Sequence, residues 1–293
     1  MYVFESRIRY SEIDADGKLT PEKLIDYFQD CSTFQSEDMG IGIGPLREKN
    51  LAWILVYWRV EILRMPGLGE KVRIGTLPYE MKGGMGLRNF LMETCDGERL
   101  ANANSVWTLV DIGTMRPVHI PQEILEGYPL EERIDMQYDS RKIRIPKTSG
   151  IEGPQVVVQE YHLDTNRHMN NGQYVRIAAG CLPPGVELKT LRIEYRRQAL
   201  LGDRISPVLY GIPASAGDDS GTERNMSVEM MDDGKPSAAD TAAGRPEPLQ
   251  TACIALNADD GRPYAVLEIG FFRTISGKGK HAENWRKTST KNR

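Results

Sequence analysis

Residues 161–181 read YHLDTNRHMNNGQYVRIAAGC, and the interpretation of the whole chain starts from this stretch. Asp164, Asn166 and His168 alternate along it, and two asparagines follow. Asparagine is a favoured N-cap at the start of a helix. Apolar residues then recur at helical spacing. The stretch therefore predicts the end of a strand, a turn that carries chemistry, and a buried helix over 170–181.

The first half of the chain contains a second version of this stretch. Residues 13–27 align with residues 163–177, and residues 59–64 align with residues 192–197. Turn, helix, strand and hairpin follow in the same order in both halves. This order favours a tandem duplication of one structural unit.

The two copies differ at the positions that bear on chemistry. Lys18 stands in the first copy where the second has His168, and Asp16 stands where the second has Asn166. The Asn/His constellation therefore occurs once. We expect the second copy to carry the chemistry and the first copy to supply something else.

Each copy contains one helix and several strand candidates rich in β-branched and aromatic residues. The first helix begins at Thr20-Pro21, an N-cap followed by proline in the first helical position. Strands are expected in the first half at 2–10, 53–63, 71–81, 86–95 and 99–110. In the second half they are expected at 156–163, 189–198, 204–211, 250–256 and 264–272. This pattern predicts an α+β fold with two antiparallel sheets, each wrapped around a helix, that could join edge to edge.

Composition suggests how the chain divides. A proline-containing linker at 139–155 is expected to separate a first unit, 1–138, from a second unit, 156–275. Within the second unit, an insert at about 213–249 has too few large apolar residues to pack, although 225–231 could be a strand. Residues 276–293 form a basic tail.

Charge and hydropathy exclude several classes of protein. The 293 residues carry a net charge of −4, which argues against nucleic acid as a partner. No apolar run is long enough to span a membrane, and the first nine residues do not form a secretory signal. The four cysteines match neither a zinc site nor a disulfide framework, and no metal ligands surround His168. We expect reduced thiols and a cytoplasmic location.

The polar trio has residue types that suit hydrolysis of an activated acyl group. The amide of Asn166 can donate to a carbonyl oxygen, and His168 can exchange a proton near neutral pH. Asp164 can hold the imidazole in one tautomer. Backbone N–H groups at the helix start, around Asn170 and Asn171, point toward the same place. A structural His/Asp pair and an ordinary helix cap remain the alternative.

Three motifs carry a family resemblance. They are Asp164-x-Asn166-x-His168-Met169-Asn170-Asn171-x-x-Tyr174, Glu194-Tyr195-Arg196-Arg197 and Ser105-Val106-Trp107. Together they resemble the acyl-acyl carrier protein (acyl-ACP) thioesterases, a plant and bacterial family with a tandem double-hotdog fold. The resemblance implies hydrolysis of fatty acyl-ACP thioesters, which ends or diverts fatty acid synthesis. It implies acyl carrier protein as the partner and no cofactor beyond the phosphopantetheine that the substrate carries.

The resemblance also implies which residues act. Asp164, Asn166 and His168 are catalytic by the family pattern. Plant members have Glu and then Cys after Tyr-Arg-Arg, whereas this chain has Gln198 and Ala199, so no cysteine nucleophile exists there. We expect water to attack directly, with His168 as the base and Gln198 positioning the water.

Further residues are expected to contact the substrate. Candidate walls of the acyl pocket in the first copy are Trp53, Trp58, Met81, Met85 and Trp107. Asn170 and Asn171 would bind near the thioester, and Arg192 and Arg196 could meet the acidic carrier protein. An acyl-CoA thioesterase and a non-enzymatic acyl-binding hotdog protein remain alternatives. Chain-length preference and pairing into a homodimer stay open.

Overall fold

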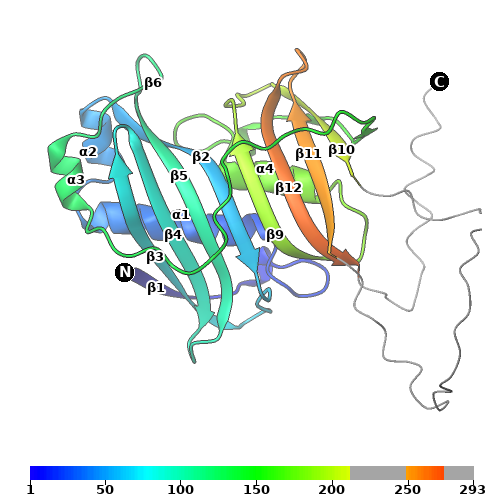
Figure 1. Ribbon diagram of the computed structural model, residues 1–293, viewed down its shortest axis with the longest axis horizontal. Coiled ribbons are helices and arrows are strands. Elements are labelled where there is room, and N and C mark those ends of the chain that lie inside the picture. The colour runs from blue at the N-terminus through cyan, green and yellow to red at the C-terminus, as the bar shows by residue number, and fades with distance from the viewer. Residues whose placement is uncertain (212–248, 274–293) are drawn as a thin grey trace, which may run out of the picture.

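The computed structural model describes residues 1–211 and 249–273 (Figure 1). The strand predicted at 225–231, the basic tail, and all but the last residue of the predicted insert lie outside the described residues. The division into units at 138 and 156 stays a prediction. Among the helices of the described ranges, none combines the length and hydropathy needed to cross a bilayer.

The first copy builds one helix against a run of long strands. Its elements are β1 (Tyr2–Arg7), η1 (Tyr10–Glu12), α1 (Pro21–Asp38), α2 (Ile43–Glu48), β2 (Leu51–Ile62), β3 (Lys71–Lys82), β4 (Met85–Thr94), β5 (Arg99–Asp111), β6 (Arg116–Pro117) and α3 (Gln122–Gly127). Thr20 is the N-cap of α1 and Pro21 its first residue, as the sequence predicts. The apolar face of α1 is fully buried, because Leu24, Ile25 and Phe28 pack into the core.

The second copy repeats the plan with a shorter helix. Its elements are β7 (Ile151–Glu152), β8 (Val156–Val157), η2 (Glu160–His162), α4 (Asn171–Ala179), β9 (Val186–Tyr195), β10 (Arg204–Tyr210), β11 (Gln250–Asn257) and β12 (Pro263–Arg273). The predicted tandem double hotdog is confirmed. Figure 1 shows α1 and α4 on the same face of one broad sheet.

The two sheets join into one, as the repeat suggested. The strand order is β1-β3-β4-β5-β2-β9-β12-β11-β10-β7, and the ladders between neighbours are antiparallel. The seam is the pair β2–β9, in which Trp58 lies opposite Ile193 and Arg59 opposite Arg192. Each copy thereby covers the open edge of the other.

One expectation about local structure is wrong, and two short helices were not predicted. The strand predicted at 156–163 ends at Val157, because the next residues turn into η2, where the Gln159 N–H donates to His162 Nδ1. The helices α2 and α3 have only six residues each, too short to show a helical period in the sequence.

The connector between the copies runs across the sheet face opposite the helices (Figure 1). It is tied to both central strands. The Gln137 N–H donates to Glu61 Oε1 on β2, and Arg192 on β9 donates to the Ser140 carbonyl. Asp139 Oδ2 lies 3.3 Å from Arg59 Nε and 3.6 Å from Arg192 Nε. One carboxylate therefore serves two arginines that face each other across the seam.

Candidate active site

The polar turn of the second copy is built by Asp164. Its Oδ1 accepts the N–H of Asn166 at 2.8 Å and the N–H of His168 at 3.2 Å. The Asp164 N–H in turn donates to the His168 carbonyl at 2.8 Å. Arg167 closes the turn with a φ of 62°, in the left-handed region. These bonds fix the backbone from which Asn166 and His168 project.

The first copy has the same turn. Asp14 Oδ1 accepts the N–H groups of Asp16 and Lys18, both at 2.9 Å, and Gly17 takes the left-handed position with a φ of 72°. The aspartate is therefore a turn-forming residue in both copies. The hydrogen bonds of the Asp164 carboxylate go to the backbone, and the expected hold of Asp164 on the His168 imidazole stays a prediction.

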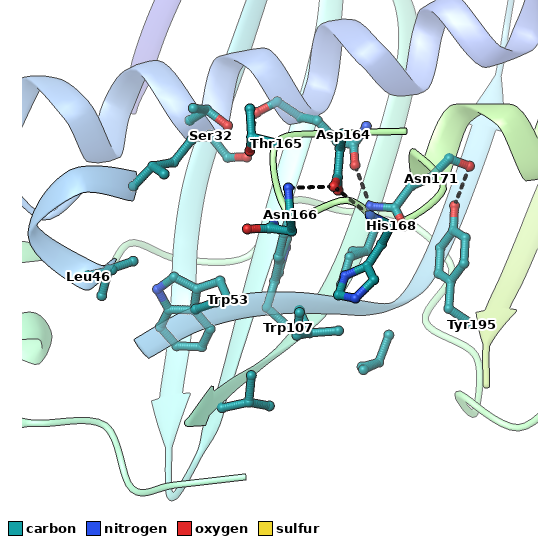
Figure 2. A pocket seen from close by; sticks show the side chains of 18 of the residues that line it. Ser32, Leu46, Trp53, Trp107, Asp164, Thr165, Asn166, His168, Asn171 and Tyr195 are labelled. Atoms are coloured by element: carbon teal, nitrogen blue, oxygen red, sulfur yellow. Dashed lines mark hydrogen bonds between the residues drawn. The ribbon is translucent and has the colours of Figure 1, made fainter. Parts of the chain in front are cut away.

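The His168 side chain projects from this turn toward the Trp107 side of the cavity (Figure 2). It is half-buried, and no protein group in the described ranges hydrogen-bonds to its imidazole. Asn166 is exposed, and its Oδ1 accepts from Arg47 Nη2 at 3.3 Å. Both ring nitrogens of His168 and the amide nitrogen of Asn166 are therefore available to a ligand.

The asparagines that start α4 hold the helix in place. Asn170 Oδ1 accepts the Gly172 N–H at 2.8 Å, which makes Asn170 the N-cap. Asn171 Nδ2 donates to Gln29 on α1 at 2.6 Å, and the Asn171 carbonyl accepts from Tyr195. Both asparagines line the cavity, although these bonds give them a structural role as well.

Gln198 lies beside the turn because the neighbouring residue is anchored on both sides. The Ala199 N–H donates to the Tyr174 hydroxyl at 3.0 Å, and the Ala199 carbonyl accepts the Met169 N–H at 2.9 Å. Burial raises the pKa of Tyr174, so its hydroxyl stays neutral. Gln198 is half-buried and faces the same cavity as His168.

A cavity of about 720 Å³ opens at this turn and is walled by both copies. From the first copy come residues of α1 and α2 and three of the predicted wall residues. From the second come the turn and the segment after β9. The predicted site residues that line the cavity are Trp53, Met81, Trp107, Asp164, Asn166, His168, Asn170, Asn171, Arg196 and Gln198.

Three predicted residues do not line it. Trp58 is fully buried in the core between Phe28 and Phe90, so it is no pocket wall. Met85 is 41% exposed at the start of β4. Arg192 is held by Glu268 and by the connector on the opposite sheet face.

The cavity extends along α1 to a buried arginine that the sequence analysis missed. Asn171 contacts Gln29, whereas Arg88 Nη1 donates to Gln35 Oε1 at 2.7 Å. Six residues of helix separate the two contacts, which is about 9 Å at 1.5 Å per residue. The Arg88 guanidinium stacks over Tyr128 at 5.2 Å, and burial lowers its pKa. A cation within an apolar strand pattern is the signal that could have singled it out.

The described part of the chain contains no cluster of potential metal ligands. Nowhere in residues 1–211 and 249–273 do three or more His, Cys, Asp or Glu side chains gather closely enough to hold an ion.

Comparison with known proteins identifies the relatives of this chain. Residues 1–128 match the family model described as the acyl-ACP thioesterase N-terminal domain. The chain is 30% identical over 208 residues to the chloroplastic palmitoyl-acyl carrier protein thioesterase of Arabidopsis thaliana. That match covers 65% of this chain and 50% of the relative, so the chain spans about half the length of this curated protein.

Solved structures share the fold over nearly the whole chain. An acyl-ACP thioesterase from Bacteroides thetaiotaomicron superposes with a TM-score of 0.72 at 19% identity, covering 92% of this chain and 96% of that one. The 12:0-ACP thioesterase from Umbellularia californica superposes with a TM-score of 0.73 at 17% identity, covering 93% and 95%. Residues 1–128 thus match the N-terminal domain of the acyl-ACP thioesterases, and the chain as a whole has the double-hotdog architecture of the solved acyl-ACP thioesterases.

Proposed function

We propose that this protein hydrolyses fatty acyl thioesters of acyl carrier protein, releasing a free fatty acid and so ending or diverting fatty acid synthesis. One observation carries the proposal. The Asn166, His168 and Gln198 side chains line one cavity, and Trp53 and Trp107 line it too. Groups able to activate water and polarise a carbonyl thus adjoin an aromatic-lined space suited to an acyl chain.

The proposed reaction is a direct attack by water. His168 takes a proton as the water oxygen bonds to the thioester carbonyl carbon, and Gln198 holds that water by a hydrogen bond. The amide nitrogen of Asn166 donates to the oxyanion. The carbon–sulfur bond then breaks, and the departing sulfur receives the proton from His168. Asp164 contributes by holding the turn.

Purified protein should be assayed against carrier-protein thioesters from short to long acyl chains. We expect hydrolysis by the wild type and at least a thousandfold lower kcat for His168→Ala, with an unchanged circular dichroism spectrum. General-base assistance is worth about 10²–10⁴ in rate, which accounts for the large loss expected of His168→Ala. Gln198→Ala removes only the group that positions the water, so it should lower kcat less, by about tenfold to a hundredfold. A His168→Ala variant that keeps wild-type activity would refute the assignment.

The carrier is part of the proposal. With one chain length, kcat/KM should be at least tenfold higher for the carrier-protein thioester than for the CoA thioester. The reverse order would make the protein an acyl-CoA thioesterase. We also propose a cytoplasmic location, no cofactor of its own, and Arg196 among the groups that face the carrier protein.

The non-enzymatic reading rests on Gln198, which replaces the glutamate of the plant pattern. A binding protein would retain a fluorescent fatty acyl probe and release no free thiol from any thioester in the panel. Binding without hydrolysis would therefore overturn the enzymatic proposal.

A further inference from the structure

We infer that Arg47 is a positioning residue for the proposed hydrolysis and acts by fixing the amide orientation of Asn166. The inference rests on the proposed function. It concerns a residue of the first copy that reaches the turn of the second. Arg47 lies on α2, whose neighbouring residue Leu46 is anchored in an apolar cluster with Leu109 and Ile124.

The contact consists of two hydrogen bonds from one nitrogen. Arg47 Nη2 donates to the Thr165 carbonyl at 3.0 Å and to Asn166 Oδ1 at 3.3 Å. All three residues line the cavity. Within the described ranges no carboxylate forms an ion pair with Arg47, unlike Arg167 and Arg196, which pair with acidic neighbours. The guanidinium is therefore directed at the turn alone.

The chemistry of the two groups sets the direction of the amide. A guanidinium has donors only, whereas an asparagine amide has an acceptor oxygen and a donor nitrogen. Arg47 thus stabilises the rotamer whose Oδ1 faces α2 and disfavours the flipped one. The Nδ2 donor of Asn166 is then turned away from Arg47 and left for the thioester oxygen. Without Arg47, both amide orientations would be populated.

A double-mutant cycle tests the inference. Arg47→Gln should lower kcat about tenfold and change KM less than twofold. Removing an oxyanion donor lowers kcat by about 10²–10³, and a donor that is only misoriented part of the time should cost less. Arg47→Lys should recover part of the loss. In an Asn166→Ala background, Arg47→Gln should change kcat less than twofold. Lys49→Gln, a charge removal at the C-terminal end of the same helix outside the cavity, should leave kcat unchanged.

Three outcomes would overturn the inference: wild-type kcat in Arg47→Gln, an equal loss of kcat with and without Asn166, or an equal loss of kcat in Lys49→Gln.

NMR separates failure of this inference from failure of the proposed function. The Asn166 side-chain amide signals, assigned by their absence in Asn166→Ala, should shift in Arg47→Gln and not in Lys49→Gln. If the wild type hydrolyses no thioester, the proposed function fails. The shift still decides whether Arg47 orients the amide, and unmoved signals would overturn that orientation.

Discussion

Asp164 stabilises the turn at the centre of the site by accepting two backbone N–H groups on one carboxylate oxygen. Asp14 makes the same bonds in the first copy, which has no histidine at the equivalent position, so the aspartate forms this turn with or without the histidine. The sequence contained this information, since both copies keep the aspartate while the histidine occurs in one. A residue common to both copies points to shared structure, and a residue present in one copy points to function.

Substitutions of the two aspartates should separate structure from catalysis. Asp164→Asn keeps an acceptor oxygen, so kcat should stay within about tenfold of wild type. Asp164→Ala removes the acceptor of the Asn166 and His168 N–H groups, and we expect a loss of about 1 kcal/mol in the free energy of unfolding together with a large fall in kcat. Asp14→Ala should lose similar stability and keep kcat. If Asp164→Asn is as inactive as Asp164→Ala, the charge acts on His168.

His162, which lies beside the turn, should make the stability of the fold depend on pH. Its Nδ1 accepts the Gln159 N–H, and its carbonyl accepts the N–H of Asn170. Desolvation lowers the pKa of His162 from 6.5, with Arg176 contributing, so the folded state favours the neutral ring. As pH falls through 6.5, the unfolded chain takes up a proton that the folded chain resists, and the unfolding free energy decreases.

Thermal unfolding between pH 5 and pH 8 checks this expectation. Wild type should lose Tm toward acid, and His162→Gln should show a shallower fall, because glutamine offers an acceptor oxygen that does not titrate. His119→Gln controls for the loss of any histidine. Parallel pH profiles for the wild type and His162→Gln would contradict the assignment.

At the scale of elements, the position of α4 against α1 depends on a glycine. A Cβ on Gly172 would lie 2.6 Å from Asp26 Oδ1 and 3.2 Å from the Glu22 carbonyl oxygen of α1. The Asp26 side chain can move, but the backbone oxygen of Glu22 cannot without shifting the helix. Since Asn171 also bonds to Gln29, the close helix contact aligns the polar turn at 164–168 with the first copy.

Gly172→Ala should therefore push α4 away from α1. Overpacking costs about 1–3 kcal/mol, and better helix propensity offsets part of it, so we expect a net loss of about 1 kcal/mol. A calorimetric Tm lower by roughly 2–4 °C would correspond to this loss. Gly44→Ala is the matched control, since Gly44 is also the second residue of its helix and a Cβ there meets nothing within 4 Å. A Gly172→Ala variant as stable as Gly44→Ala would contradict the contact.

The sequence predicted most long elements, because period-2 and helical patterns extend over many residues. It could not show that Trp58 belongs to the core whereas Trp53 lines the cavity. A register shift between Leu55 and Tyr57 keeps both tryptophans on the helix side of β2, where α1 covers Trp58 and leaves Trp53 at the cavity. Whether a tryptophan on this face of β2 is core or cavity wall depends on how far α1 extends over it, and strand periodicity does not indicate that. Arg47 was missed for a related reason, since its helix is short and its partners are remote in sequence.

At the scale of the molecule, the seam between the copies relies on the connector. Arg59 and Arg192 lie opposite each other on β2 and β9, and Asp139 neutralises both. Arg59 is only 8% exposed, so its charge is weakly solvated without that carboxylate. The repeat predicted that the two sheets meet. It could not predict that a carboxylate of the connector pairs with arginines of both sheets, because no sequence pattern indicates such a contact.

Asp139→Asn should destabilise the whole fold, because two like charges across the seam would lose their shared counter-ion. We expect urea unfolding to show a loss of about 2 kcal/mol in the free energy of unfolding. This is less than the roughly 3–5 kcal/mol lost when a fully buried ion pair is broken, because the site is partly solvated. Asp135→Asn changes the same connector at a residue that forms no ion pair in the described ranges, and it should be neutral. Equal stability of the two variants would show that the connector does not hold the seam electrostatically.

The unequal turns of the two copies also set a stoichiometry. Lys18 and His168 occupy equivalent corners of one pseudo-symmetric sheet, so under the proposed mechanism each chain would offer one hydrolytic position. A hotdog pair assembled from identical subunits would instead repeat its chemistry twice. Titration with a non-hydrolysable acyl thioester analogue should therefore saturate at one equivalent per chain. Each chain would then serve one carrier protein at a time, and an assembly of two chains would serve two.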